Sequence, residues 1–484
     1  MHTDNIFNFE YSYLSLPDRF YSLVHPTVAG QSEMVLKNAA LLKELGIPTD
    51  QTTRLLAVLS GNEVPSNSTP FAQAYAGHQF GHFTMLGDGR AIILGEHKTA
   101  DFKRYDIQLK GSGPTPYSRS GDGRGTLKSM LREYLMSEAM YHLRIPTSRS
   151  LAVVKTKGPV YRESIHPGAV LTRLMESHIR IGTFEYASYF GGTDDLKALV
   201  NYSIQRLFPE IGQDENPVLS LLQKVMDLQI DLVVNWMRVG FIHGVMNTDN
   251  VAISGETFDY GPCAFMNAYH PETVFSSIDA HGRYAFANQP GIIKWNLARL
   301  AEALLPLLHK EADKALVMAQ QAIEQFDEHW KDRYYRTMLH KLGIENRTTE
   351  DEGLVDELLE LMKVLKLDYT NTFSALSRGA EGTVNPQDHP ALKPWLEKWQ
   401  ISVSKNSQGL DTAKSIMKAY NPVFIPRNHL VEEALDAATA GDLSLIERML
   451  HILATPYEDQ ANCENYKTPP ESDFEANYQT FCGT

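Results

Sequence analysis

Four polar side chains in this 484-residue chain could together hold a phosphorylated ligand and a metal ion. Lys110 ends the strand-like run 106–110, and Glu133 lies 23 residues later in a helical pattern. A buried ammonium held by a carboxylate can be aimed at phosphate oxygens. Asn250 and Asp259 follow in two later loops, and amide and carboxylate oxygens are hard ligands that suit Mg²⁺. Taken singly, each residue also fits an ordinary surface lysine, helix glutamate or turn.

The order of these residues along the chain is that of a protein kinase. A kinase catalytic loop reads His-Arg-Asp with an asparagine further on, and Asp-Phe-Gly follows. Here His243 and Asn250 keep the seven-residue separation, and Asp259 begins Asp-Tyr-Gly. Val245 stands at the position of the kinase catalytic aspartate, where it cannot accept a proton, whereas Asp249 lies close by. The sequence therefore predicts a kinase-like site in which ordinary phosphoryl transfer is in doubt.

Two glycine-rich segments add candidate phosphate contacts. Gly87-Asp88-Gly89-Arg90 precedes a β-rich run, and glycines let backbone N–H groups approach phosphate oxygens while the arginine adds charge. The segment 111–125 holds five glycines and two arginines just before a helix, which suits an anion site. A hairpin turn and a flexible surface loop are the respective alternatives. A loop of this length is, however, uncommon in a compact domain unless it is functional.

The elements that must position these residues are predicted from hydrophobic periodicity. Short strands are expected at 91–94, 105–109, 151–154 and 169–171, and one helix runs from an N-cap at Thr126 to about Leu143. Helices then dominate, at 218–239, 293–307, 312–332, 354–365, 392–399, 430–438 and 443–453. We expect an α+β fold of the two-lobed protein-kinase type with a helical C-terminal extension. Its expected parts are a β-rich lobe (1–190), a helical lobe with the extension (191–455) and a tail (456–484).

Composition limits the classes of partner. Hydrophobic residues make up 43% and charged residues 21%, as in a globular enzyme. A net charge of −14 argues against nucleic acid or an anionic membrane as the main partner. No apolar run approaches the roughly 18 residues of a membrane helix, and the acidic start does not read as a signal peptide. Three cysteines do not make a disulfide framework, so a cytoplasmic protein is expected.

Five longer motifs resemble one known family, selenoprotein O, the protein adenylyltransferases derived from pseudokinases. They are Tyr-Ala-Gly-His-Gln-Phe-Gly at 75–81, Gln-Leu-Lys-Gly-Ser-Gly at 108–113, Ser-Arg-Ser-Gly-Asp-Gly-Arg at 118–124, the loop 243–250 and Asp-Tyr-Gly-Pro at 259–262. The segment 422–433 is also similar to the family. The resemblance therefore extends over nearly the whole chain.

The resemblance implies that ATP binds reversed relative to kinases, so that AMP passes to Ser, Thr or Tyr hydroxyls of proteins. Asp249 would accept the proton, Asn250 and Asp259 would bind Mg²⁺ or Mn²⁺, and Glu133 would position Lys110. Arg173 and Arg180 would anchor the terminal phosphates, a task that suits the planar fork of arginine. The nucleotide would be bound by Gly87, Gly89, Arg90, Lys110, Asp122, Gly123, Arg173, Arg180 and Asp259.

Several alternatives stay open. The same site could use UTP and transfer UMP, could phosphorylate, or could belong to a non-catalytic nucleotide-binding pseudokinase, although both metal ligands and Asp249 are present. His78 and His82 could share a helix face as in zinc sites, but Gln79 replaces the glutamate that a metalloprotease has there. Cys482 lies where some family members place selenocysteine, and Cys263 is its candidate partner in a regulatory disulfide; a spare thiol is the alternative.

Overall fold

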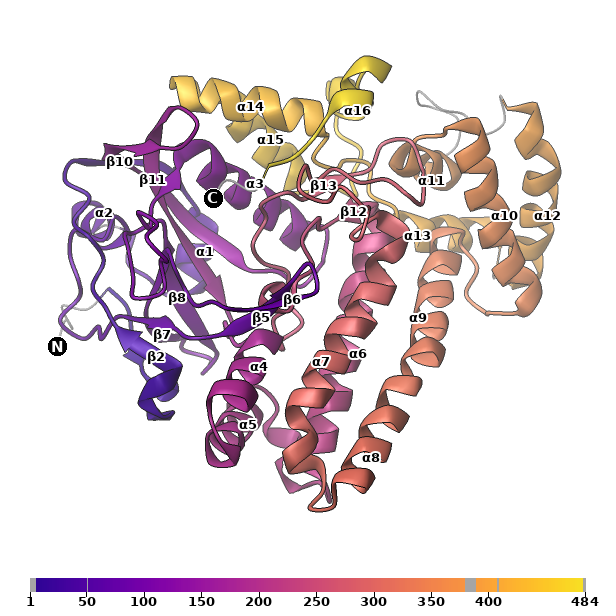
Figure 1. The fold of residues 1–484 in the computed structure, drawn as a ribbon. Helices are drawn as coiled ribbons and strands as arrows, with labels where there is room; N and C mark the ends of the chain where they lie inside the picture. The colour runs from indigo at the N-terminus through magenta and orange to yellow at the C-terminus, as the bar shows by residue number, and fades with distance from the viewer. Residues whose placement is uncertain (1–5, 50, 379–388, 407–408, 482–484) are drawn as a thin grey trace.

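The structure is a computed structural model that describes residues 6–49, 51–378, 389–406 and 409–481. A nine-stranded sheet forms one side of the molecule (Figure 1), and its strand order is β2-β4-β7-β8-β11-β10-β3, with β1 on β7 and β9 on β11. All these pairings are antiparallel. The strands are β1 (Phe9–Glu10), β2 (Tyr21–Leu23), β3 (Ser32–Lys37), β4 (Phe71–Gln73), β7 (Ala91–Lys98), β8 (Arg104–Lys110), β9 (Gly125–Thr126), β10 (Arg149–Tyr161) and β11 (Ile165–Met175).

The register of the central strands brings two basic side chains together. Ala91 of β7 pairs with Lys110 of β8, and Gln108 of β8 pairs with Arg173 of β11. Because side chains alternate between the faces of a strand, Gln108 and Lys110 share one face. The opposite face packs on α1 (Ala39–Glu44) and α2 (Thr52–Leu59) in a separate apolar cluster that includes Ile107 and Leu109.

Helix α3 (Leu127–His142) packs on β10 and β11. Thr126 is its N-cap as predicted, because the Thr126 hydroxyl accepts a hydrogen bond from the Ser129 amide. The apolar residues that predicted the helix are all buried: Leu127, Met130, Leu131, Tyr134 and Leu135. Glu133 lies on the same helix and is only 3% exposed, so packing fixes the side chain that the sequence paired with Lys110.

The rest of the molecule is mainly helical, as expected. Beyond the sheet lie α6, α7 and α9, with α10 to α13 farther out, and α14 to α16 return to lie near α3 (Figure 1). The helices are α4 (Ile181–Phe190), α5 (Thr193–Leu207), α6 (Pro217–Val239), α7 (Gln289–Leu308), α8 (Ala312–Glu324), α9 (Phe326–Lys341), α10 (Thr349–Leu365), α11 (Tyr369–Arg378), α12 (Lys393–Asn406), α13 (Leu410–Tyr420), α14 (Asn428–Ala440), α15 (Ser444–Leu453) and α16 (Ser472–Asn477). The mixed, kinase-like α+β fold with a helical C-terminal region is confirmed.

One local prediction was wrong, and the alternative of a helix face shared by His78 and His82 is not what the structure has. The expected helix 312–332 is two helices, α8 and α9, which meet at Gln325, where the backbone amide bonds to the carbonyl of Ala322 in a tighter turn. Neither glycine nor proline marks that break. His78 and His82 lie not on a helix but on the two strands of a hairpin, β5 (Ala76–Gln79) and β6 (His82–Met85). Phe80 and Gly81 make its turn with φ of 51° and 87°.

The C-terminal segment lies on the body of the protein. Thr480 forms a bridge with Ser276, and its hydroxyl donates to the carbonyl of Pro262, 2.7 Å away. Within the described ranges, no helix is both long and apolar enough to cross a membrane.

Candidate active site

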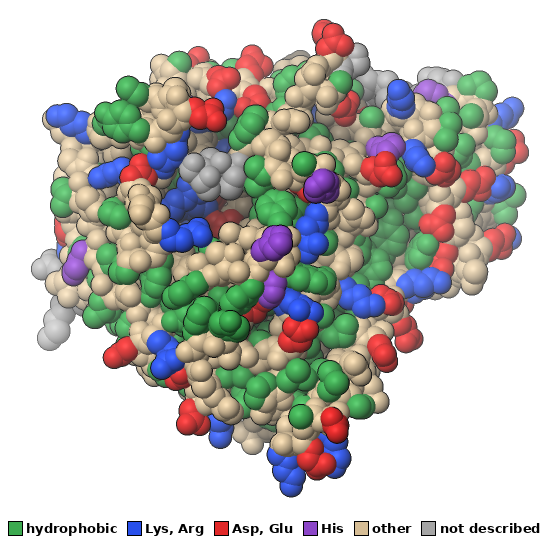
Figure 2. Space-filling model, in the orientation of Figure 1, with side chains coloured by type: hydrophobic (Ala, Val, Ile, Leu, Met, Phe, Trp, Pro, Cys, Tyr) green, Lys and Arg blue, Asp and Glu red, His purple; other side chains and the backbone are tan. Residues whose placement is uncertain are grey.

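One cavity of about 640 Å³ brings the predicted site residues together. In Figure 2 Lys and Arg side chains (blue) gather around a hollow on the left of the face, with acidic side chains (red) inside it. Every residue that the sequence assigned to nucleotide, metal or proton transfer lines this cavity: Gly87, Gly89, Arg90, Lys110, Asp122, Gly123, Arg173, Arg180, Asp249, Asn250 and Asp259. Glu133 lies directly behind them, within hydrogen-bond distance of Lys110 and Arg173.

A buried network of four charges forms the centre of the site. Lys110 Nζ donates to Glu133 Oε2 at 2.6 Å and to Asp259 Oδ1 at 2.5 Å. Arg173 Nη1 donates to Glu133 Oε1 at 2.8 Å and to Asp259 Oδ1 at 2.7 Å. The Arg173 Nε–H donates to Gln108 Oε1 at 2.7 Å, which fixes the guanidinium plane. Two cations and two carboxylates therefore stabilise one another, three of them almost fully buried and Asp259 24% exposed at the cavity, and the predicted Lys110–Glu133 pair is present.

Arg180 occupies a second buried position, not the surface position that an isolated arginine would usually take. Its guanidinium lies 4.0 Å from the ring centre of Tyr75, and its Nη2 is 3.3 Å from Asp88 Oδ1. The side chain is 2% exposed, and its Nε has no hydrogen-bond partner among the described residues. A buried, unpartnered donor is costly unless an acceptor arrives. Arg180 is thus able to bind an anion in the cavity.

The two predicted metal ligands lie on adjoining loops. Asn250 Nδ2 donates to the carbonyl of Val245 at 3.0 Å, which directs the amide group. Burial opposes ionisation of Asp259, but Arg173, Lys110 and Arg180 together hold the pKa of its carboxyl well below the usual range. Asp259 also has a φ of 60°, in the left-handed region that non-glycine residues seldom adopt. Such strain persists where surrounding contacts impose it, often at functional sites.

Asp249 is the acidic residue of the catalytic-loop segment that faces the cavity. It is 7% exposed, and burial raises the pKa of its carboxyl to about 6. Its Oδ1 is buried without a hydrogen-bond partner in the described parts of the chain. Val245 lines the same cavity and offers no proton acceptor. The geometry therefore supplies one unpaired carboxylate oxygen beside Asn250.

The hairpin β5–β6 holds the loop 247–249, and the sequence did not predict this contact. The His78 amide donates to Thr248 Oγ1 at 2.7 Å, and the Phe80 amide donates to Asn247 Oδ1 at 3.0 Å. Gln79 Nε2 lies 3.5 Å from Asp249 Oδ2. The motif at 75–81 carried the resemblance to the family, but its contact with the loop 247–249 joins residues about 170 positions apart, and no local pattern reports such a contact.

The glycine-rich segments meet across the mouth of the cavity. Gly87 has a φ of 144°, and a Cβ there would lie 2.4 Å from the Tyr117 ring, so the approach requires glycine. Asp122 Oδ2 pairs with Arg162 Nη1 at 2.9 Å, and Arg162 comes from the β10–β11 turn, which gave no signal in the sequence. Seven Lys and Arg side chains against four Asp line the cavity, so it is positively charged within a chain of net charge −14. That balance suits a polyphosphate.

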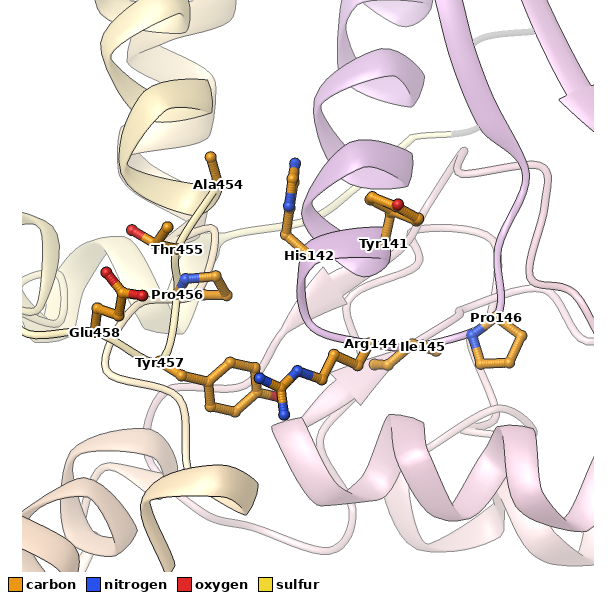
Figure 3. Close-up of a pocket in the computed structure, with 10 residues that line it drawn as sticks. All are labelled: Tyr141, His142, Arg144, Ile145, Pro146, Ala454, Thr455, Pro456, Tyr457 and Glu458. Carbon is orange, nitrogen blue, oxygen red and sulfur yellow. The ribbon is translucent and has the colours of Figure 1, made fainter. Parts of the chain in front are cut away.

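A separate cavity of about 590 Å³ lies beyond the C-terminal end of α3 (Figure 3). It is lined by 141–142, 144–146 and 454–458, and none of the predicted site residues reaches it. There the guanidinium of Arg144 lies over the ring of Tyr457 at 4.9 Å. This cavity marks a junction between α3 and the C-terminal segment, not the predicted chemistry.

The remaining sequence hypotheses concern metal and thiol groups. In the described residues no group of three or more His, Cys, Asp and Glu is placed to hold a metal ion, so the zinc alternative finds no support there. His78 instead pairs with Glu185. Cys263 is buried, and burial raises the pKa of its thiol to about 11. Cys482 lies outside the described residues, so the disulfide stays a prediction.

A β-rich lobe with a Lys–Glu pair, joined to a helical lobe with an Asn-containing loop and an Asp-Tyr-Gly turn, defines the class: an enzyme with a kinase-like fold. The chain belongs to the SelO family, whose family model, "Protein adenylyltransferase SelO", matches residues 5–454. It is 50% identical over 480 residues to "Protein nucleotidyltransferase YdiU" of Bacillus mycoides (strain KBAB4). The aligned region covers 99% of this chain and 98% of the relative. Proteins of the same name from Bacillus cereus (strain AH187) and Bacillus thuringiensis (strain Al Hakam) give the same identity and coverage. The protein is therefore a nucleotidyltransferase.

Proposed function

We propose that this enzyme transfers AMP from ATP to Ser, Thr or Tyr hydroxyls of proteins and releases pyrophosphate. The proposal rests on which residue of the catalytic loop can accept a proton. Val245 stands where a kinase has its base, and Asp249, with its unpartnered Oδ1, faces the same cavity. The family description names adenylyl transfer, which supports the proposal.

The nucleotide would be held mainly through its phosphates. Lys110, Arg173 and Arg180 would bind the β- and γ-phosphates, which then form the leaving group, and Glu133 would keep Lys110 in place. Arginine's planar fork suits phosphate oxygens. Gly87, Gly89, Arg90, Asp122 and Gly123 would surround the rest of the nucleotide from the two glycine-rich segments.

The reaction that follows is a displacement at the α-phosphorus. The acceptor hydroxyl oxygen forms a bond to the α-phosphorus, and the bond from that phosphorus to the oxygen bridging to the β-phosphorus breaks. The electron pair leaves with pyrophosphate, and the hydroxyl proton passes to Asp249. Positioning and charge stabilisation dominate such transfers, so a reversed nucleotide changes the product without new covalent chemistry.

Asn250 and Asp259 would hold the divalent ion, Mg²⁺ or Mn²⁺. One amide and one carboxylate fit an ion that takes its other ligands from substrate phosphates and water, as Mg²⁺ commonly does. When bound, the ion would neutralise phosphate charge near the α-phosphorus.

Intact-mass analysis of the protein incubated with a candidate acceptor protein and either ATP or UTP tests the proposal. We expect an AMP adduct from ATP that is absent in Asp249→Asn, while ATP still raises the Tm of that variant. An adduct from UTP alone would favour the uridylyl alternative, and a phosphate adduct would favour a kinase. Binding of ATP with no adduct from either nucleotide would favour a non-catalytic pseudokinase.

A further inference from the structure

A groove of about 760 Å³ opens beside the candidate active site. The two cavities share Phe80 and Ile278 as lining residues, so they adjoin. Apolar walls come from Phe80, Ile278 and Ile292, and the charged side chains that line the groove are Asp279 and Arg283. Ile292, His281 and Arg283 do not line the nucleotide cavity, and Ile278 is 50% exposed.

The wall of the groove is tied directly to the loop that carries Asp249. The Tyr284 hydroxyl donates to Asn247 Oδ1 at 2.5 Å, and the Phe80 amide donates to the same oxygen. The rings of Phe80 and Tyr284 lie 5.3 Å apart, centre to centre. Asn247 is two residues before Asp249, so the wall of the groove contacts the loop that carries the proposed proton acceptor.

Arg283 gives the groove its charge. The carboxylate of Asp279 is already used, since its two oxygens accept the backbone amides of Arg283 and Tyr284 at 2.8 and 2.7 Å. The guanidinium of Arg283 lies 5.0 Å from the ring centre of Trp295, and its Nε is buried with no hydrogen-bond partner. The guanidinium also lies 5.8 Å from the ring centre of Tyr284 and forms a side-chain hydrogen bond with that residue, but no ion pair with a carboxylate is found for it among the described residues.

Arg299, which contacts the same tryptophan, differs from Arg283 in having an ion-pair partner. Arg299 lies on the same Trp295 at 5.1 Å, but it pairs with Glu302 at 2.7 Å and does not line the groove. The Nε of each arginine is buried without a hydrogen-bond partner among the described residues, so the two differ in the ion pair and in their position relative to the groove. Arg283 is therefore placed to bind a carboxylate that comes from outside the chain.

We propose that this groove docks the acceptor protein, as an extended segment that carries an Asp or Glu close to the hydroxyl to be modified. Arg283 pairs with that carboxylate, and Phe80, Ile278 and Ile292 contact the neighbouring apolar atoms. The proposal rests on the transfer to protein hydroxyls proposed above and adds the local sequence that the enzyme prefers. Segments with Lys or Arg at those positions place like charges together and are disfavoured.

Two fluorescein-labelled peptides with one central Tyr test the groove. They are identical except that Glu or Lys flanks the Tyr on both sides, and binding to the full chain is followed by fluorescence anisotropy. Wild type should bind the Glu peptide about threefold to tenfold more tightly, the range expected of a partly exposed ion pair. Arg283→Gln should remove the preference, Arg283→Glu should reverse it, and Arg283→Lys should keep most of it.

Arg299→Gln is the matched control, because it removes a cation from the same ring outside the groove. It should bind both peptides like wild type, and ATP-induced stabilisation of each variant checks that it folds. Equal binding of the two peptides by wild type, or the same loss in both arginine variants, would overturn the proposal. Transfer of label from ATP is then measured on the same peptides. A binding preference without transfer contradicts the proposed function alone, whereas equal binding with equal transfer contradicts the groove alone.

Discussion

At the scale of single residues, the centre of the site is a set of opposite charges, most of them buried. Lys110, Arg173, Glu133 and Asp259 are paired at 2.5 to 2.8 Å. Removing one member of a buried network leaves its partners uncompensated, and that cost exceeds the net value of the pair. When Lys110 is removed, Arg173 still pairs with both Glu133 and Asp259, so the fold should survive.

Lys110→Ala should therefore lose affinity for ATP without losing its structure. The ammonium that the site would aim at phosphate is gone, while Arg173 still pairs with Glu133 and Asp259. Thermal shift with ATP and metal measures the loss, because a ligand that binds only the folded state raises Tm. Lys103→Ala is the control, since Lys103 is exposed and pairs with the exposed Asp101, away from the cavity. An equal ATP-induced rise in Tm in Lys110→Ala and wild type would contradict the assigned role.

Among the structural elements, the hairpin β5–β6 matters most for chemistry because it fixes the loop 247–249. Gly77 lies so close to that loop that a Cβ would be 2.8 Å from Asp249 Oδ1 and 3.2 Å from its amide nitrogen. Gly182, at the start of α4, closes the same space from another side. The two glycines let hairpin, helix and loop pack around the proposed proton acceptor.

Gly77→Ala should displace Asp249 and lower the transfer rate by roughly tenfold or more, because small misplacements of a reacting group are costly. ATP binding, which uses other residues, should change little. Gly158→Ala is the matched control, since no atom lies within 4 Å of a Cβ at that position. Initial rates and ATP-induced Tm shifts separate the two effects. A transfer rate in Gly77→Ala equal to that of Gly158→Ala would contradict the role of the hairpin.

The elements were largely predictable because their signals are local. Thr126 and the apolar stripe after it predicted α3, and the β-rich runs 91–94 and 105–109 predicted strands where β7 and β8 lie. The break at Gln325 was missed because helical periodicity continues through it. The contacts of Gln79 and Arg162 were missed for another reason: their partners lie far away in the sequence, and only the fold brings them together.

At the scale of the whole molecule, the C-terminal helices support the helix that carries Glu133. Lys128 pairs with Glu432 and Asp436 of α14, and Arg132 pairs with Glu432. At the other end of α3 the Tyr457 hydroxyl donates to the carbonyl of Leu143 at 2.9 Å. Helix α14 and Tyr457 thus contact the two ends of α3. The division of the chain near residues 190 and 455, and its cytoplasmic location, stay predictions.

Tyr457→Ala should lower Tm, because it removes a packed ring, the bond to Leu143 and the bond from Arg238. The free energy of unfolding should fall by about 2–4 kcal/mol, as for other large-to-small changes in packed sites. Differential scanning fluorimetry gives the Tm change. Tyr161→Ala, at an exposed hairpin end with 66% exposure, is the control and should change Tm little. Equal Tm values in the two variants would show that this junction does not support the fold.

The central claim is that AMP, not phosphate, reaches the acceptor, and a label swap tests it most directly. The protein and an acceptor are incubated with divalent metal and ATP labelled either at the α-phosphorus or at the γ-phosphorus. We expect label on protein from the α position only, and we expect Asp249→Asn and Asp259→Ala to lose it. Label that arrives from the γ position and is lost in Asp259→Ala would contradict the account and make the enzyme a kinase.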